Sequence, residues 1–281
     1  MTDQVVRVGI DPRGDWCYVA RVVWGSGRPQ VKALARFHSD QLPGHKILTG
    51  AVAIWGVPDS KAQIKRMAIT PSGDIDAHDL AAFELAQGLL DDPSEFCLSA
   101  VPLSLEGEYL GMSVRRTTLE DFGADFGDGD CGWQVRSVAL THGWITFGRE
   151  QEGELIALID FTPESATISI MHRRRIAATA RIATSDVDLR AASGQRRLGA
   201  ELRTVVDFRL DSLIEHGISV PLSGLLLCGA DMADGLTETI DGFFSVPIVT
   251  PSISPGFFPQ SADLSSVPLD RYLIALGLTV E

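Results

Sequence analysis

A group of three strand-like segments separated by two turns occurs twice in this chain of 281 residues, and this repetition limits the fold more than any other feature. The segments are rich in apolar and β-branched residues, and the first turn of each group contains proline. They span residues 5–10, 16–24 and 30–37 in the first group and 155–160, 166–171 and 175–181 in the second. Both opening segments lead into an Ile-Asp pair, at Asp11 and Asp160, and an acidic residue follows four positions later in each group. A duplicated unit of three strands predicts two related lobes, each built on its own sheet.

Helical material follows the second group of strands. Apolar residues between 198 and 214 recur at the spacing of one helix face, and Gly217 stands where a helix of this extent would end. Residues 222–228 form a nearly continuous apolar run, which predicts a buried strand. A glycine turn then leads into a second predicted helix over residues 232–243.

Residues 45–115 carry a different pattern between the two groups. They contain strand-like segments at 49–56, 64–69, 95–103 and 108–114, and a helix at 76–90 with Leu80, Phe83, Ala86 and Leu90 on its apolar face. This order predicts a small α/β subdomain inserted in the first lobe. The expected division is therefore a first lobe at 1–44, the insert at 45–115, a return to the first lobe at 116–150, a second lobe at 151–261 and a C-terminal return helix at 262–281.

The composition indicates a globular protein and disfavours two kinds of partner. Apolar residues make up 45% of the chain and charged residues 22%, which excludes a disordered or fibrous protein. The net charge of −13 repels nucleic acid and anionic lipid, whereas it would attract a basic segment of a partner. The four cysteines are scattered, as expected of core residues in a reducing compartment. No apolar stretch is long enough to cross a bilayer, so we expect a cytoplasmic protein without direct membrane insertion.

Several short motifs match the residue pattern of known sites but lack the flanking secondary structure or the spacing that those sites require. Residues 127–132 match G-x-G-x-x-G, yet they follow a predicted helix at 118–126 and precede a strand, so a connecting loop is the better interpretation. The acidic residues around this motif lack the spacing of a calcium loop. The basic run at 172–175 fits a solvated hairpin turn. The six histidines lie at scattered positions, and neither a G-x-S-x-G motif nor a phosphate-binding Lys-Ser/Thr pair is present.

Five passages occur in the order typical of one known fold. Val-Gly-Ile-Asp at 8–11, Leu-Ile-Asp at 158–160 and LLLCGADMADGL at 225–236 follow the order of the actin fold. AVAIWGVPDSKAQIKRMAI at 51–69 and GAELRTVVDFRLDS at 199–212 extend the match. Together they resemble the PilM family, the actin-like cytoplasmic proteins of type IV pilus assembly that are related to FtsA. The resemblance covers almost the whole chain, and it implies a two-lobed actin-like (ribonuclease H-like) α/β fold with a small inserted α/β subdomain.

The resemblance also implies where a nucleotide would bind. In nucleotide-binding members of the fold, the two hairpin turns and a glycine turn surround the nucleotide. The corresponding residues here are Asp11, Gly14, Asp160, Thr162, Gly229 and Ala230. Asp11 and Asp160 stand where carboxylates organise Mg²⁺, and they would hold this ion only if ATP binds.

The two turns depart from the pattern that a phosphate requires. Phosphate-binding turns offer several backbone N–H groups, but Pro12 and Pro163 have none. Asp15 and Glu164 add negative charge beside the same turns, and the usual Gly-Gly pair is present only as Gly229 followed by alanine. We therefore expect a degenerate ATPase with weak or lost activity, no assigned catalytic residue, and either no cofactor or ATP with Mg²⁺.

Two functions from different classes remain open. The first is an adaptor in a type IV pilus or type II secretion-like assembly platform, peripheral at the inner membrane through its partner. The resemblance implies that it binds the N-terminal cytoplasmic tail of a PilN-like membrane protein in a groove beside the insert, together with other platform components. A tail rich in Lys and Arg would suit the net charge of this chain. The alternative is an active ATP-dependent enzyme of the same fold, an ATPase or a small-molecule kinase. The prolines in the turns favour the adaptor.

Overall fold

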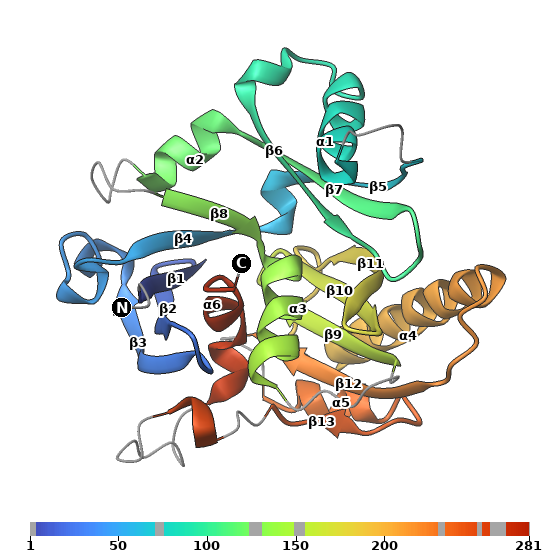
Figure 1. The fold of residues 1–281 in the computed structure, drawn as a ribbon. Coiled ribbons are helices and arrows are strands. Elements are labelled where there is room, and N and C mark those ends of the chain that lie inside the picture. Colours follow the sequence, from blue (N-terminus) through green and yellow to red (C-terminus); the bar gives the residue numbers. More distant parts are fainter. Residues whose placement is uncertain are drawn as a thin grey trace.

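Two five-stranded mixed sheets with the same strand arrangement form the two lobes of the molecule (Figure 1). The computed structural model describes residues 4–70, 76–123, 131–148, 155–229, 234–251, 255–258 and 268–280. The sheet of the first lobe has the order β3-β2-β1-β4-β8, with β1 (Val5–Arg13), β2 (Trp16–Trp24), β3 (Gln30–His38), β4 (Val52–Val57) and β8 (Cys131–Val135). The sheet of the second lobe has the order β11-β10-β9-β12-β13, with β9 (Leu155–Phe161), β10 (Ser165–His172), β11 (Arg175–Ala183), β12 (Leu222–Cys228) and β13 (Ile248–Val249).

The central strands β1 and β9 occupy equivalent places in the two sheets. Each pairs with its hairpin partner in antiparallel fashion on one side and with a parallel strand on the other. The predicted duplication of three strands is thereby confirmed, and each copy gains two further parallel strands.

Helices cover the sheets and separate them from each other. Between the sheets lie α3 (Arg136–Phe147) and α6 (Leu273–Gly277), which bury apolar residues against β2 on one side and against β9 and β12 on the other (Figure 1). The opposite face of the second sheet is covered by α4 (Ala192–Glu215) and α5 (Leu236–Asp241). Gly217 has a φ of +85° just after α4, as its predicted place beyond the helix end requires.

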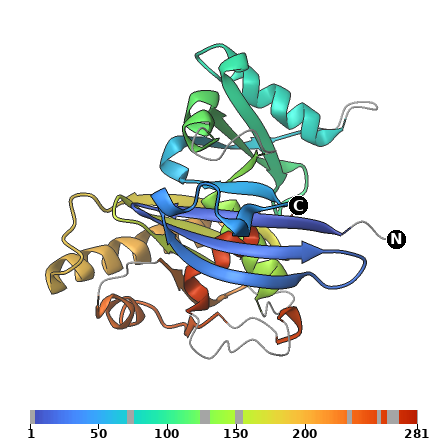
Figure 2. The ribbon, with the colours of Figure 1, turned by 90° about the vertical axis from the view of Figure 1, so that its left-hand side faces the viewer.

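A three-stranded antiparallel sheet forms the insert, which lies at the top of Figures 1 and 2. It shares a buried core with the start of α3 and with β11, in which Leu110 and Met112 pack with Val138 and Ile176. The order of the insert sheet is β5-β7-β6, with β5 (Ala62–Ala68), β6 (Phe96–Pro102) and β7 (Glu108–Arg115). One face is covered by α1 (Ala77–Gln87), and α2 (Arg116–Gly123) leads back to the first lobe. Short 3₁₀ turns complete the described elements: η1 (Ser39–Gln41), η2 (Lys46–Leu48), η3 (Asp59–Lys61), η4 (Pro93–Glu95), η5 (Pro255–Phe257) and η6 (Leu269–Arg271).

Two expectations about the insert are corrected. The predicted strand at 49–56 is β4, which pairs with β1 in the first sheet, so the insert begins after β4 rather than at residue 45. The predicted apolar face of the helix at 76–90 is only partly correct, because Leu80 packs against the core of the insert but Phe83 and Leu90 do not. The helix buries Ala81 and Leu85 against the sheet, and it leaves Phe83 60% exposed. Leu90 lies beyond the end of the helix and is fully exposed.

Two other expectations lie partly outside the described residues. The loop-like motif at 127–132 reaches the described part only at its last two positions, where β8 begins. Of the helix expected at 232–243, the described part forms α5. Among the residues that the structure describes, no helix combines the length and the apolar character needed to cross a membrane.

The contact between α3 and α6 depends on two glycines. A Cβ atom on Gly277 would lie 1.7 Å from the carbonyl oxygen of Ala139, and one on Gly143 would lie 2.1 Å from the carbonyl oxygen of Leu273. Because the clashing atoms belong to the backbone, a side chain at either glycine forces the helices apart.

We therefore expect Gly277→Ala to lower the free energy of unfolding by about 1–3 kcal/mol, the usual cost of overpacking a core. Chemical denaturation would measure this loss. Gly27→Ala is the matched control, because a Cβ atom there meets nothing within 4 Å. Equal stabilities of the two variants would contradict the close packing of α3 and α6.

Candidate functional site

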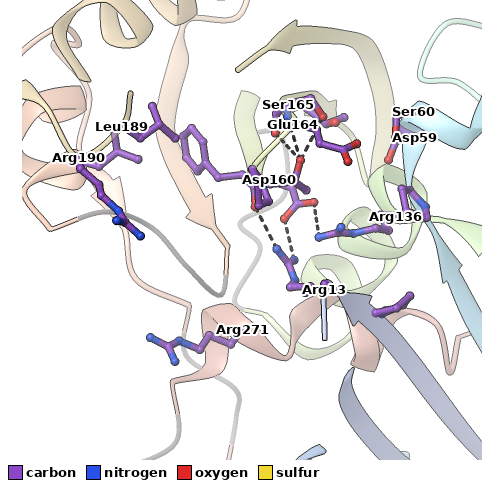
Figure 3. Close-up of a pocket in the computed structure, with 18 of the residues that line it drawn as sticks. Arg13, Asp59, Ser60, Arg136, Asp160, Glu164, Ser165, Leu189, Arg190 and Arg271 are labelled. Atoms are coloured by element: carbon purple, nitrogen blue, oxygen red, sulfur yellow. Dashed lines mark hydrogen bonds and ion pairs between the residues drawn. The ribbon is translucent and has the colours of Figure 1, made fainter. Parts of the chain in front are cut away.

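A cleft of about 880 Å³ lies between the two lobes, where both hairpin turns face the start of α3 (Figure 3). Its walls come from each copy of the duplicated unit and from the segments that join the lobes. The polar and charged residues that line it include Arg13, Asp59, Ser60, Arg136, Asp160, Thr162, Glu164, Ser165, Thr167, Arg190, Asp234 and Arg271.

Four charged side chains at the base of this cleft form a closed network, which we call the Arg–Asp quartet: Asp11, Arg13, Arg136 and Asp160. Arg13 donates from Nε to Oδ2 of Asp11 at 2.8 Å and from one terminal nitrogen to Oδ1 of Asp160 at 2.8 Å. Its other terminal nitrogen donates to the carbonyl oxygen of Phe161 at 3.1 Å. Arg136 is ion-paired through Nε with Oδ1 of Asp11 at 3.1 Å and through a terminal nitrogen with Oδ2 of Asp160 at 2.8 Å. Each of the four carboxylate oxygens therefore faces a guanidinium nitrogen.

The local structure explains why these residues meet. Asp11 and Arg13 are two positions apart on β1, so their side chains point to the same face of the sheet. Asp160 occupies the matching place on β9 in the second lobe. Arg136 is the first residue of α3, directly after β8, and it is ion-paired with both Asp11 and Asp160. Figure 3 shows its side chain beside Asp160.

The quartet is buried and balanced in charge. None of its four side chains is more than 6% exposed. Burial alone would lower the pKa of Arg13, but the charges of Asp11 and Asp160 outweigh burial and raise it above the usual value. Two positive and two negative groups thus compensate each other where water is excluded.

A third acidic group, Asp59, lies beside the two carboxylates of the quartet. Burial raises the pKa of Asp59, and the hydrogen bond from Ser137 and the charge of Arg136 oppose this rise. The backbone N–H of Ser137 donates to Oδ2 of Asp59 at 3.2 Å, which fixes the carboxyl group at the start of α3.

The second hairpin turn uses most of its hydrogen-bonding groups internally. The backbone N–H of Thr162 donates to the carbonyl oxygen of Ser165 at 2.8 Å, and the N–H of Ser165 donates to the hydroxyl of Thr162 at 3.0 Å. Pro163 has no N–H. Thr184 donates to the carbonyl oxygens of Thr162 and Pro163. Such a turn has few donors left for a phosphate.

The structure brings together four of the six residues predicted for a nucleotide site. Asp160, Gly14 and Thr162 line the cleft, and Asp11 lies directly behind it in the quartet. Gly229 follows β12 with a φ of +153° and is not among the residues that line the cleft. Ala230 lies outside the described residues.

These residues do not fit Mg²⁺ as they are arranged. Magnesium takes oxygen ligands in octahedral geometry, and its protein ligands are usually one or two carboxylates. Here all four oxygens of Asp11 and Asp160 are held by arginines, and a cation would have to displace both guanidinium groups. Elsewhere in the described ranges, no three His, Cys, Asp or Glu side chains gather as metal ligands would.

Sequence reasoning missed the two arginines that determine this arrangement. The spacing of Asp11 and Arg13 on one strand was a usable signal, because it places a positive charge beside the expected magnesium ligand. Arg136 gave no local signal, since its partners lie 125 and 24 positions away in the sequence.

Comparison with known proteins identifies the fold. No protein-family model and no curated protein matches the chain. The solved structure of a PilM–PilN type IV pilus biogenesis complex matches with a TM-score of 0.66 at 15% identity, over 97% of each chain. A protein of unknown function with an actin-like ATPase fold from Bacteroides thetaiotaomicron matches with a TM-score of 0.53 at 8% identity, over 98% of this chain and 96% of that one. These two matches, together with the duplicated sheets, confirm the predicted two-lobed actin-like α/β fold.

We expect Arg13→Met to lower the free energy of unfolding by about 3–5 kcal/mol, because it leaves two buried carboxylates with a single positive partner. Denaturant titration would measure this loss. Arg190→Met is the control, since Arg190 is an exposed arginine of the same cleft and its loss should cost no more than about 0.5 kcal/mol. A loss for Arg13→Met as small as that of the control would mean that the quartet does not join the lobes.

Proposed function

We propose that this chain is a non-enzymatic actin-fold adaptor of a type IV pilus or type II secretion-like assembly platform. In this role it binds the N-terminal cytoplasmic tail of a PilN-like inner-membrane protein, contacts other platform components, and stays peripheral at the inner membrane through its partner. Its interlobe cleft has lost most or all ATPase activity.

The Arg–Asp quartet is the observation that carries this proposal. In an active ATPase of this fold, the two strand-end carboxylates would have to be free to organise Mg²⁺. Here Arg13 and Arg136 already neutralise Asp11 and Asp160 and span the gap between the lobes. The cleft therefore has in its own side chains the positive charge that a bound metal ion would otherwise supply.

The assignment to an assembly platform is supported by the extent of the structural likeness. The match to the PilM–PilN complex covers 97% of both chains and includes the insert as well as both lobes. At 15% identity this likeness supports the fold directly, and the partner is our inference from it.

The alternative, an ATP-dependent ATPase or small-molecule kinase, has less support in the site. Such an enzyme needs phosphate donors in both hairpin turns and a free carboxylate near the reacting phosphate. The second turn uses the N–H groups of Thr162 and Ser165 internally, and both strand-end carboxylates are paired.

We expect no binding of Mg-ATP at concentrations up to about 1 mM by calorimetry, a limit that corresponds to about −4 kcal/mol. Phosphate release in the presence of the protein should equal that of the buffer. Pro12→Gly with Pro163→Gly should strengthen any residual affinity, since each change provides one N–H group. A dissociation constant in the micromolar range for the unmodified protein would favour the ATP-dependent enzyme instead.

We expect a labelled synthetic peptide with the sequence of the cytoplasmic tail of the PilN-like protein from the same organism to bind the full chain, as measured by fluorescence anisotropy. Its affinity should weaken as salt rises, because exposed charges are screened over about 10 Å at 0.1 M ionic strength. A peptide of the same composition in scrambled order is the control. No saturable binding up to about 1 mM, or equal binding of the scrambled peptide, would remove the adaptor proposal.

A further inference from the structure

A second cleft, of about 380 Å³, lies between the insert and the second lobe. The insert contributes the apolar side chains of Ile64, Leu103 and Leu110 to one wall. The other wall is β11, from which residues 177–181 line the cleft, and β11 lies below β5 and β7 in Figure 1. A volume of this size is within the range of pockets that hold small molecules.

Two arginines reach this cleft from opposite faces of the second sheet. Arg181 of β11 is directly opposite Thr167 of β10, which in turn is opposite Asp160 of β9, so Arg181 lies on the face that carries Asp160. Arg209 belongs to α4, which covers the other face. Both arginines line the cleft beside β11, the outermost strand of its sheet.

Neither arginine has a carboxylate partner within the described part of the chain. Arg181 donates to the backbone oxygen of Asp59 at 3.3 Å, and Nε of Arg209 is buried and has no hydrogen-bond acceptor. A buried donor without an acceptor is rare in folded proteins, and it calls for a bound water or ion that satisfies it. The third arginine of the cleft, Arg66, is by contrast paired with Glu108.

The charge of the two arginines is not balanced by the wall of the cleft. Asp59 is the one acidic side chain among the described residues that line it. Its Oδ2 accepts a hydrogen bond from the N–H of Ser137 at 3.2 Å, and neither Arg181 nor Arg209 forms an ion pair with it. Burial also raises the pKa of Asp59, which disfavours its charged form. Two positive charges thus remain to be compensated in the cleft.

We propose that this cleft binds a small phosphate monoester, with the phosphate group between Arg181 and Arg209 and the organic group against Ile64 and the other apolar side chains of the insert. A phosphate monoester carries about two negative charges at neutral pH and three acceptor oxygens, so one group serves both guanidinium groups. A carboxylate has a single charge and leaves one arginine uncompensated. Thr167 and Thr179 also line the cleft, and each has a hydroxyl group that can donate to a phosphate oxygen.

Calorimetric titration of the full chain with phenyl phosphate, at constant ionic strength and without divalent cations, tests the site. We expect one saturable site with a dissociation constant below about 1 mM. Inorganic phosphate should bind at least about threefold more weakly because it lacks the apolar contact, and benzoate at least about tenfold more weakly because it has one charge. No saturable binding of phenyl phosphate up to about 10 mM, or equal binding of benzoate, would overturn the proposal.

Arginine variants locate the anion. Arg181→Gln and Arg209→Gln should each weaken the binding of phenyl phosphate at least about tenfold, the usual value of one charge-assisted hydrogen bond. Arg175→Gln is the matched control, because Arg175 is an exposed arginine of β11 that does not line the cleft. Arg190→Gln is the control for the interlobe cleft, which Arg190 lines. Both controls should bind within about twofold of the unmodified protein, and a loss in either as large as in Arg209→Gln would contradict the proposed site.

Thermal unfolding separates a specific site from weak binding at many surface arginines. A ligand that binds only the folded protein raises its unfolding temperature. Phenyl phosphate should therefore raise this temperature for the unmodified protein and for Arg175→Gln, but not for Arg209→Gln. Equal shifts in all three proteins would mean an adventitious anion only and would overturn the site. None of these measurements uses the tail peptide, so this site and the adaptor function succeed or fail separately.

Discussion

The relative position of the two lobes depends on one buried network of ion pairs. Asp11 and Arg13 come from the first lobe, Asp160 comes from the second, and Arg136 comes from the helix that joins them. A carboxylate buried near a second carboxylate would be unstable, and a buried guanidinium would be equally costly. The four groups are tolerated together because each compensates two others. The hairpin turns, the first turn of α3 and the cleft in front of them must therefore keep the positions in which the four charges meet.

This arrangement follows from the duplication itself. Two copies of the same three-strand unit place their Ile-Asp ends at equivalent points, and packing of the copies around α3 brings the two ends together. A pair of facing carboxylates is then available for a metal ion or for cationic side chains. In this chain cationic side chains face the carboxylates, because the residue two positions beyond Asp11 and the first residue of α3 are both arginines, Arg13 and Arg136.

The sequence predicts the parts of this structure that rest on local patterns. The strand at 222–228 and the helix end at Gly217 follow from an apolar run and from the need for a left-handed residue, and both are confirmed. β4 was assigned to the insert because a parallel strand meets its partner far along the chain, and no neighbouring residue reports which sheet it joins. The pattern correctly places Leu80 on the packed face of α1, but it also favours the large and exposed Phe83, whereas the small Ala81 makes the contact. In the site, the repeat identifies Asp11 and Asp160, but the ion pairs that join them to two arginines arise only from the folded arrangement.

The position of α6 affects the order in which the two lobes fold during translation. This short helix completes the core of the first lobe, where Ala275 and Leu276 pack against Tyr18 and Val22 of β2. Arg7 of β1 also donates to the carbonyl oxygen of Thr279, across 272 positions of sequence. The apolar face of β2, one of the first strands to be translated, is therefore covered only after nearly the last residues of this sequence have been made. The second sheet, α4 and α5 are translated in the meantime, and most of their core is drawn from one continuous stretch of chain. Vectorial synthesis therefore favours early closure of the second lobe and late closure of the first, which leaves the face of β2 exposed to chaperones in the interval.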